Sequence, residues 1–453
     1  MNVENKTIFN WSRTKKFSGE IFKPVNYDEL EFFIKNNLEK KTISIMGGGC
    51  SYGDCYLNQE GMIIDMSKFD KIIEINFDQK FAVVQAGVLI EDLLNKLLNK
   101  GYYISSVPGA NNATIGGCIN SNVHGKDSFK EGVFSNNVMS IKVIDSSGKI
   151  FDLDKSNENF FYALGTYGLN YLILEVKLKL EKKDTSLLNV KTKKFNNYEE
   201  MISLFEIFEK ENYDMIGSWV DHFDEKGRGI FKAAKWSKNN ELNNFKKINL
   251  KISFIQRFFI NMFYPIIKVF FVNRFFIKLS NKLLFLVSSE SVKNVNYSDF
   301  YFPQQKLLPE ESKLFMKGKV NIQILLPVKN IKQNLELISK TCGKYQLESW
   351  WLGVKKHKKN NYLFNFALDG FDVTLQWSKK FIEKDNFKNF YEELMKIIIE
   401  NKCLVYLTQD VLLDKKNFYK IYDNQEIFIE NKKKIDPNFI FKNDLFNRLF
   451  LKN

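Results

Sequence analysis

The sequence predicts an α+β protein built of two lobes, and three observations support this prediction. Its 453 residues are 44% hydrophobic and 15% aromatic, which is enough apolar material for more than one core. Short apolar runs alternate with helical patterns until about residue 180. From about residue 185 to about residue 400 glycine becomes rarer, and longer helical and strand patterns alternate, which indicates a second lobe.

In the first lobe, short apolar runs predict strands at ISIMG, MIIDM, KIIEI and FAVVQAG. Residues 90–101, IEDLLNKLLNKG, have apolar side chains at helical spacing and end in glycine, which predicts a helix. The run VMSIKVIDSSGKIFDL predicts a hairpin that turns at Ser147-Gly148. Residues 165–180, GTYGLNYLILEVKLKL, predict a glycine turn that leads into a strand.

In the second lobe, YEEMISLFEIFEKEN has helical spacing, whereas VNIQILLPV and FDVTLQW predict strands. The chain has no internal repeat and no low-complexity linker. These elements complete an α+β pattern.

The composition argues against several classes of site. The net charge of +14 accompanies an abundance of Lys, Asn, Ile and Phe, which is a bias typical of an AT-rich genome. The sequence also lacks a stripe of interleaved basic and aromatic residues, so nothing in it indicates nucleic-acid binding. Three histidines without partners at ligand spacing make a metal site improbable. An odd number of cysteines without CxxC spacing predicts neither a disulfide framework nor a zinc site; they are Cys50, Cys55, Cys118, Cys342 and Cys403.

The amino terminus, MNVENKTIFNWSRTKKF, lacks the pattern of a signal peptide. Residues 252–287 are the most apolar region, but spaced Lys and Arg residues leave no run of the roughly 18 to 20 apolar residues that a membrane span needs. Two interpretations stay open for this region: a segment that lies on an anionic membrane surface, or a buried helix pair. We expect a cytoplasmic protein, with peripheral contact to the inner membrane face as the open alternative.

Two stretches rich in glycine indicate a nucleotide site. They are GGGCSYGD, residues 47–54, and PGANNATIGGCINSNVHGKDS, residues 108–128. A GxGxxG fingerprint fails because Tyr52 occupies the third glycine position, and a P-loop fails because Asp127 follows Gly125-Lys126. Glycine lets backbone N–H groups approach a phosphate without a Cβ in the way. The two loops are therefore predicted to close on one pyrophosphate from opposite sides.

The motifs GGGCSYGD, VPGANNATIGG, SNVHGKDS and GTYGLNYLILE resemble the FAD-binding domain of the vanillyl-alcohol oxidase superfamily, also called PCMH-type. Within it, the chain is most similar to the decaprenylphosphoryl-ribose oxidase family, the flavoprotein half of an epimerase. The likeness covers nearly the whole chain and includes NWSR, SWVD, GRGIF, YFPQQ, QILLP, YLTQD and KKKIDPNFIFKNDLFNRL.

The resemblance implies bound FAD and three parts of the chain. These are a PCMH-type FAD-binding domain at 1–183, a cap domain for the substrate at 184–402, and a carboxy-terminal segment at 403–453 that returns to the FAD domain. The residues that match cofactor-binding positions are Gly47, Gly48, Gly49, Cys50, Ser51, Tyr52, Gly109, Thr114, Gly116, Gly117, Ser121, Asn122, His124, Ile173 and Tyr406.

The resemblance also bears on how the flavin is held. Related sugar-lactone and alditol oxidases attach it covalently through a histidine just before the serine of the first loop, where this chain has Cys50. A second attachment in other oxidases uses a cysteine in the second loop, where residues 110–112 read Ala-Asn-Asn. We therefore predict non-covalent FAD.

The resemblance points to Tyr52, His124, Gln323 and Lys355 around the reacting carbon, with His124 either bonding flavin or substrate or bracing its loop. The family's YxxKD segment reads YLTQD here, so Gln409 replaces a lysine. Glutamine can donate a hydrogen bond but carries no charge. Lys355 or Lys402 could supply the missing charge.

The predicted function is oxidation of a secondary hydroxyl of a sugar, polyol or lipid-linked sugar by hydride transfer to FAD, in envelope polysaccharide synthesis. A separate short-chain reductase would complete an epimerisation. Two alternatives stay open. One is an aldonolactone or alditol oxidase that uses oxygen. The other is a membrane-surface binding protein with a vestigial flavin site.

Overall fold

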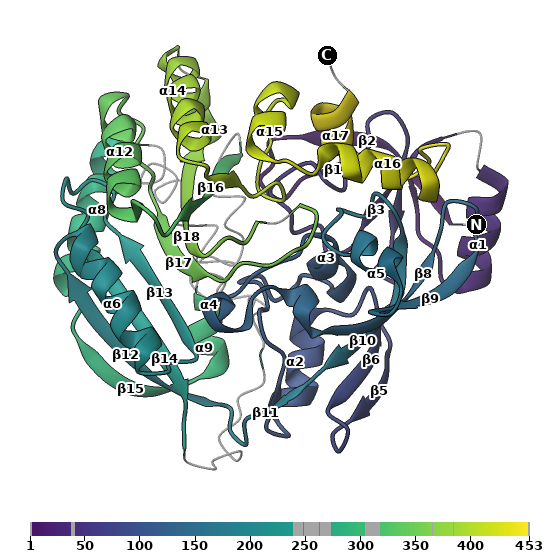
Figure 1. Cartoon of the computed structure of the whole chain (residues 1–453), viewed down its shortest axis with the longest axis horizontal. Helices are drawn as coiled ribbons and strands as arrows, with labels where there is room; N and C mark the ends of the chain where they lie inside the picture. The colour runs from purple at the N-terminus through teal and green to yellow at the C-terminus, as the bar shows by residue number, and fades with distance from the viewer. Residues whose placement is uncertain are drawn as a thin grey trace.

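The computed structural model describes residues 2–37, 41–238, 248, 262, 273–303, 318–364, 366–383 and 385–451. Figure 1 shows two lobes side by side, with the helices of the carboxy-terminal part lying across one end of the first lobe. The α+β prediction is confirmed, because helices and strands alternate in both lobes.

Among the described residues, the first lobe contains a four-stranded sheet, a five-stranded sheet and a two-stranded pair of β7 (Tyr102–Tyr103) and β11 (Glu181–Lys182). The first runs in the order β1-β2-β4-β3 and has parallel pairs at β2-β4 and β3-β4. Its strands are β1 (Val3–Phe9), β2 (Lys16–Phe22), β3 (Ile43–Met46) and β4 (Met62–Asp65). The second is antiparallel and runs β5-β6-β10-β8-β9. Its strands are β5 (Ile72–Asn76), β6 (Phe81–Gln85), β8 (Val138–Ile144), β9 (Ile150–Asp154) and β10 (Leu172–Lys179).

Helices of the first lobe follow from apolar spacing and turn chemistry. In α2 (Ile90–Leu98) the apolar residues at helical spacing are the buried ones, so the predicted helix is confirmed. The predicted hairpin joins β8 to β9 and turns at Gly148, whose φ of 84° suits glycine. The remaining elements of this lobe are α1 (Tyr27–Asn37), β7 (Tyr102–Tyr103), α3 (Ile115–Asn120), α4 (Ser128–Glu131), η1 (Phe134–Asn137), α5 (Glu158–Ala163) and β11 (Glu181–Lys182).

The second lobe is built on one antiparallel sheet of eight strands, in the order β15-β12-β14-β13-β17-β18-β16-β19. Its strands are β12 (Leu187–Phe195), β13 (Met215–Val220), β14 (Gly229–Trp236), β15 (Ser291–Asn296), β16 (Lys319–Pro327), β17 (Leu352–His357), β18 (Gly370–Ser378) and β19 (Leu404–Val405). Its helices are α6 (Tyr198–Lys210), α8 (Arg274–Val287), α9 (Tyr297–Tyr301), α12 (Ile331–Lys344), α13 (Lys379–Ile382) and α14 (Asn386–Glu400).

The strands of this sheet alternate in polarity. In β16, Ile322 and Ile324 belong to the hydrophobic core, whereas Asn321 and Gln323 between them line a cavity. Because successive side chains of a strand point to opposite faces, one face is apolar and the other polar. The apolar face packs in the same core as α6, α12 and α14. The polar face is therefore available to form the wall of a site.

The carboxy-terminal segment joins the two lobes. It contains α15 (Lys415–Ile421), α16 (Gln425–Ile435), α17 (Asp444–Phe446) and η3 (Asn447–Leu451). Phe441 forms a parallel bridge with Ile43 of β3, and the side chain of Asn443 donates to the carbonyl of Cys55 at 2.7 Å. Arg448 bonds Asp54 at 2.8 Å and Asp410 at 2.9 Å. These contacts accord with a segment that returns to the first lobe.

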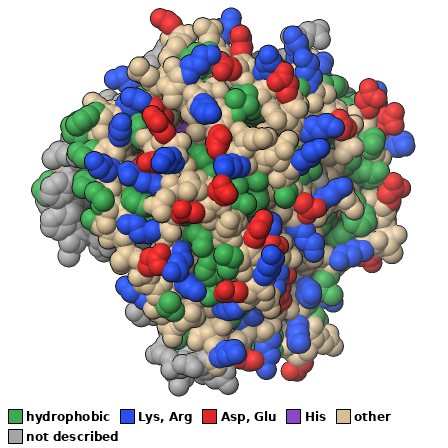
Figure 2. Space-filling view, turned by 60° about the vertical axis from the view of Figure 1, so that its left-hand side comes forward, with side chains coloured by type: hydrophobic (Ala, Val, Ile, Leu, Met, Phe, Trp, Pro, Cys, Tyr) green, Lys and Arg blue, Asp and Glu red, His purple; other side chains and the backbone are tan. Residues whose placement is uncertain are grey.

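Charge is spread over the surface. Figure 2 shows Lys and Arg side chains interspersed with Asp and Glu on the face drawn there. Among the described helices, none is long and apolar enough to span a lipid bilayer. Part of the apolar region at 252–287 lies outside the described residues; its described part includes α8, in which only Ile277 and Asn281 are buried. The two interpretations of this region, a surface segment and a buried helix pair, concern a stretch of which most of residues 252–272 lie outside the described residues.

Arg448 should be a large contributor to stability. Burial alone would lower the pKa of Arg448, but the two carboxylates raise it above its usual range, so the guanidinium stays charged. The substitution Arg448→Met leaves Asp54 and Asp410 buried without their partner, and we expect the free energy of unfolding to fall by about 3 to 5 kcal/mol in urea denaturation. As a control, Lys332→Met removes an exposed pair with Glu199 and should leave the denaturation midpoint unchanged. Equal midpoints for the two variants would contradict the assignment.

Candidate functional site

A cavity of about 900 Å³ lies between the two lobes. Its first wall comes from the two glycine loops, residues 47–52 and 108–117, and from the segment 120–126 that follows α3. Its second wall is the polar face of the large sheet, to which β13, β14, β16, β17 and β18 contribute. The volume lies in the range of sites for cofactors and other organic ligands. The two loops therefore meet at one cavity, where both contribute to the same wall; that they close on a pyrophosphate from opposite sides stays a prediction.

Two glycines of the first loop allow this loop to touch the second. A Cβ atom on Gly47 would overlap the hydroxyl of Thr114, and one on Gly48 would overlap the carbonyl oxygen of Asn112. Thr114 is held in place because its hydroxyl accepts a hydrogen bond from the N–H of Gly117 at 3.2 Å. These glycines are thus required for contact between the loops as well as for any ligand.

Two glycines of the second loop border open space. A Cβ atom on Gly109 would meet nothing within 4 Å, and one on Gly117 would meet only the Thr114 hydroxyl, at 3.0 Å. Both residues line the cavity. A side chain at Gly109 would occupy cavity volume, and one at Gly117 would do so with a small shift of the Thr114 hydroxyl. This arrangement is a cradle for a flat or extended ligand that approaches the backbone.

The cavity brings together nearly all residues that the sequence singled out. Of the predicted cofactor residues, only Asn122 is absent from its lining; Asn122 has a φ of 43° and lies beside Gly165. The residues that line it are Gly47, Gly48, Gly49, Cys50, Ser51, Tyr52, Gly109, Thr114, Gly116, Gly117, Ser121, His124, Ile173 and Tyr406. The candidate catalytic residues Gln323, Lys355 and Gln409 line it as well. Their roles remain predictions.

Several buried polar atoms at the cavity have no hydrogen-bond partner among the residues that the structure describes. They are Asn120 Oδ1, His124 Nε2, Trp219 Nε1, Asn321 Oδ1, Gln323 Oε1 and Thr408 Oγ1. Buried polar atoms are normally paired, so these atoms indicate a polar ligand. FAD fits, because its flavin ring carries both hydrogen-bond donors and acceptors and its pyrophosphate suits the glycine loops.

Hydrogen bonds fix the positions of the aromatic residues and of Gln409. The carbonyl of Tyr52 accepts bonds from Asn10 and Ser12 of the NWSR motif, and its hydroxyl accepts one from Lys319 at 3.1 Å. Tyr406 donates to the carbonyl of Ser121 at 2.8 Å. The carbonyl oxygen of Gln409 accepts from Asn321 at 3.2 Å. Each side chain is therefore held by a neighbour in the first or second lobe.

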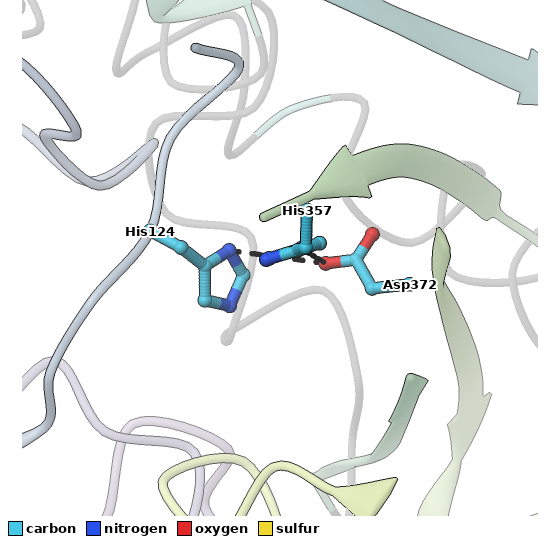
Figure 3. A group of neighbouring side chains, drawn as sticks. All are labelled: His124, His357 and Asp372. Carbon is cyan, nitrogen blue, oxygen red and sulfur yellow. Dashed lines mark ion pairs between the residues drawn. The ribbon is translucent and has the colours of Figure 1, made fainter. Parts of the chain in front are cut away.

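A buried network of charged and polar groups closes the site, and its centre is Asp372 of β18. Oδ2 of Asp372 lies 3.0 Å from His357 Nε2 and 3.3 Å from Lys355 Nζ, and it accepts a hydrogen bond from Gln323. Lys355 Nζ is also 2.9 Å from His124 Nδ1. Figure 3 shows His124 approaching from a loop, with His357 and Asp372 on neighbouring strands. The network joins the two lobes across the cavity.

The protonation states follow from burial and neighbouring charge. Burial would raise the pKa of Asp372, but Lys355 and His357 lower it well below its usual range, so the carboxylate is ionised. Burial and the Lys355 charge lower the pKa of His124 well below its ordinary value. Burial also lowers the pKa of His357. At neutral pH both imidazoles are therefore uncharged.

The structure corrects the expectation that no histidine has a partner at ligand spacing. His124, His357 and Asp372 place their ligand atoms within 4.8 Å of one another, although they are far apart in the sequence. Lys355 Nζ contacts both His124 and Asp372, so an ammonium group already supplies the positive charge there. Within the network, His124 Nε2 and Gln323 Oε1 have no hydrogen-bond partner among the described residues.

The positions of nearby lysines show which of them could supply the positive charge that Gln409 lacks. Lys402 is exposed and does not line the cavity, so it cannot replace the lysine of the family. Lys355, the other lysine predicted to supply this charge, lines the cavity. Lys319, which the sequence analysis missed, is buried beside Tyr52 and Gln376.

Sequence reasoning missed Asp372, His357 and Lys319, although a signal was present. In VNIQILLPV and FDVTLQW, polar residues alternate with apolar ones inside strands of a large core. A half-polar strand that is buried on both faces indicates a site. Polar residues two positions apart on a strand lie on the same face. The pairs Asp372 and Thr374, and Asn321 and Gln323, would therefore have identified the polar face of the sheet.

Comparison with known proteins agrees with this geometry. Residues 20–154 match the family model described as an FAD binding domain. The chain is 22% identical to the decaprenylphosphoryl-beta-D-ribose oxidase of Mycolicibacterium smegmatis over 98% of both chains. It is 28% identical to the L-gulonolactone oxidase of Bos taurus over 38% of this chain and 39% of that one. It is 26% identical to the mitochondrial L-galactono-1,4-lactone dehydrogenase of Arabidopsis thaliana over 39% and 29%.

The open space at Gly117 can be tested by filling it. In Gly117→Val the added methyl groups project into the cavity and meet little protein, so the variant should fold but purify without the yellow colour of a flavin. Absorbance near the flavin bands and circular dichroism measure the two effects separately. The control is Gly343→Ala at an exposed position of α12, where a Cβ meets nothing within 4 Å; it should keep the flavin and gain up to about 1 kcal/mol of stability. Full flavin occupancy in Gly117→Val would refute the assignment of this loop.

Proposed function

Because the chain belongs to the PCMH-type FAD-binding oxidoreductases of the vanillyl-alcohol oxidase superfamily, we propose that it oxidises a secondary hydroxyl of a lipid-linked sugar that carries a phosphate. It is an FAD-dependent oxidoreductase that acts on CH–OH groups. The single observation that carries the choice of substrate is the set of lysines that line the cavity on the side of the second lobe. Sugars and polyols without a phosphate are the other candidate substrates.

The residues of the first lobe would hold the cofactor. The loops at 47–52 and 109–117 would surround the pyrophosphate, Ile173 would lie near the adenine, and Tyr406 near the flavin ring. When bound, FAD supplies a ring that accepts hydride. Cys50 stands where related oxidases attach the flavin, and burial raises the pKa of its thiol to about 12. A neutral thiol is a poor nucleophile, which supports non-covalent FAD.

The second lobe would orient the hydroxyl group. Oxidation requires the carbon to lie about 3 to 3.5 Å from the hydride acceptor and the hydroxyl proton to pass to a nearby base. Tyr52, His124 and Lys355 line the cavity and can exchange protons, and the amides of Gln323 and Gln409 can hydrogen-bond the sugar. The closed wall of β16, β17 and β18 would exclude water from the reacting carbon.

Charge at the cavity favours an anionic ligand. The charged residues of its described lining are Lys126, Lys232, Lys293, Lys355 and Asp299. Lys232 of β14 and Lys293 of β15 lie in the second lobe, so they belong to the wall opposite the loops that would hold the pyrophosphate. Burial lowers the pKa of Lys126 to about 7, and a neighbouring anion would favour its charged form. A phosphate on the substrate would supply this anion.

An apolar surface adjoins the mouth of the cavity. Leu284 and Val287 of α8 line the cavity, while the exposed apolar residues of this helix are Phe275, Leu279, Leu283, Leu284, Leu286 and Val287. Lys278 and Lys282 are exposed on the same helix. Apolar side chains next to lysines suit the surface of an anionic membrane. We propose that α8 rests on such a membrane and receives the lipid chain of the substrate, and that a separate reductase uses the ketone.

The substrate proposal is tested by anaerobic bleaching of the flavin absorbance with a panel of sugars, polyols, lactones and lipid-linked phosphosugars. We expect the phosphosugars to bleach it at the lowest concentration. In Lys232→Met the KM for a phosphosugar should rise about tenfold or more, because a charge-assisted hydrogen bond of about 1.5 to 3 kcal/mol is lost. The exposed Lys179→Met in the first lobe is the matched control. Bleaching by lactones alone, with flavin that stays attached after acid denaturation, would favour a lactone oxidase instead.

Membrane contact is tested by sedimentation with vesicles. The protein should bind vesicles that contain phosphatidylglycerol and release them at high salt, because screening weakens the attraction of the lysines. Leu283→Asp in α8 should abolish binding, whereas Leu337→Asp, at an exposed position of α12, should not. Equal binding of both variants would exclude α8 as the contact.

A further inference from the structure

We propose that Asp372 is a positioning residue that sets which atoms of the substrate pocket donate hydrogen bonds and which accept them. It holds the ammonium of Lys355 against His124 Nδ1, so that His124 presents Nε2–H to the cavity. It also holds the amide nitrogen of Gln323, so that Gln323 presents Oε1. The inference rests on the proposed function only in taking this cavity as the place where substrate binds.

The contact between Lys355 and His124 fixes the tautomer of the imidazole. Lys355 Nζ lies 2.9 Å from His124 Nδ1, and an ammonium group can only donate hydrogen bonds. Nδ1 must therefore accept, and in a neutral imidazole the hydrogen is then on Nε2. His124 is neutral because burial and the charge of Lys355 lower its pKa. Nε2 is buried and has no partner among the described residues, so its hydrogen is available to a ligand.

Asp372 holds Lys355 in this position. Its Oδ2 is 3.3 Å from Lys355 Nζ, and its Oδ1 accepts the backbone N–H of Lys355 at 3.1 Å. The two residues are directly paired across β17 and β18, so the contact is part of the sheet register. Asp372 is fully buried, whereas the Lys355 side chain is 25% exposed toward the cavity. Without the carboxylate, the ammonium would be free to turn toward water and leave His124 Nδ1.

The same carboxylate orients Gln323. The amide nitrogen of Gln323 donates to Oδ2 of Asp372. The reverse orientation would direct the amide oxygen at an ionised carboxylate, which repels it. Gln323 Oε1 is consequently turned away from Asp372, is buried without a partner among the described residues, and belongs to a side chain that lines the cavity. It is an acceptor for a substrate hydroxyl.

His357 supports the carboxylate from behind the pocket. Its Nε2 lies 3.0 Å from Asp372 Oδ2, and the charge of the carboxylate favours a hydrogen on this nitrogen over one on Nδ1. His357 does not line the cavity, and its ring meets that of His124 edge to face at 4.6 Å. Among the groups that Asp372 positions, the described network thus offers His124 Nε2–H as a donor and Gln323 Oε1 as an acceptor. His124 can stabilise the oxygen of a ketone product, and the hydroxyl proton must pass to another group.

The tautomers can be measured directly by ¹⁵N NMR on holoprotein labelled at histidine, because the chain has only His124, His222 and His357. At neutral pH we expect Nε2–H for all three. His222 is an internal control, because its Nδ1 accepts the backbone N–H of Ser349 at 2.8 Å and its tautomer is therefore set by a group other than Asp372. Signals are assigned with His222→Gln and His357→Gln. Nδ1–H in wild-type His124 would overturn the inference.

Two substitutions separate the contributions. In Asp372→Asn both His124 and His357 should lose their single tautomer, while His222 keeps its own. In Lys355→Met only His124 should change, because Asp372 still accepts from His357. Lys356→Met is the control, since Lys356 pairs with Glu209 and does not line the cavity. If Asp372→Asn fails to fold, Lys355→Met still decides, and an unchanged His124 spectrum in it would refute the proposal. These outcomes do not depend on which substrate is oxidised.

Discussion

The contact between the two glycine loops is the constraint on which the site depends. Gly47 and Gly48 pack so closely against Thr114 and Asn112 that no side chain fits between them. This contact brings a loop that leaves β3 beside a loop that leads into α3, and it leaves Gly117 facing open space. A cradle for an extended anionic group follows from backbone alone. One wall of the cavity is thus shaped by missing side chains, whereas the other presents polar side chains.

That opposite wall follows from the two-residue period of a strand. In β16 and β18 the apolar residues of one face belong to the core with the helices, and polar residues between them, Asn321, Gln323, Thr374 and Gln376, line the cavity. The core therefore stabilises the strands and at the same time fixes the polar groups in place. Asp372 is fully buried, but four donors surround it and offset the loss of hydration. Such a network resists displacement better than groups on a loop would.

Local patterns were sufficient to predict much of the fold. The strand at Ile43–Met46 and the helix at Ile90–Leu98 follow from apolar spacing, and the meeting of the loops follows from the distribution of glycine. The charge network was not predicted, because Lys355 and Asp372 become neighbours only through the register of two strands. Nothing in a single sequence states this register. The exposure of Lys402 was likewise invisible, since it depends on how the chain leaves α14.

The last turn of the chain has a consequence for biosynthesis. Arg448 binds Asp54 beside the first loop, and Phe441 and Asn443 contact the strand and turn that support it. Arg448 lies 394 positions after Asp54, so a ribosome must release the chain through residue 448 before these contacts can form. The glycine loop at 47–52 is therefore without this support while the intervening residues are being translated.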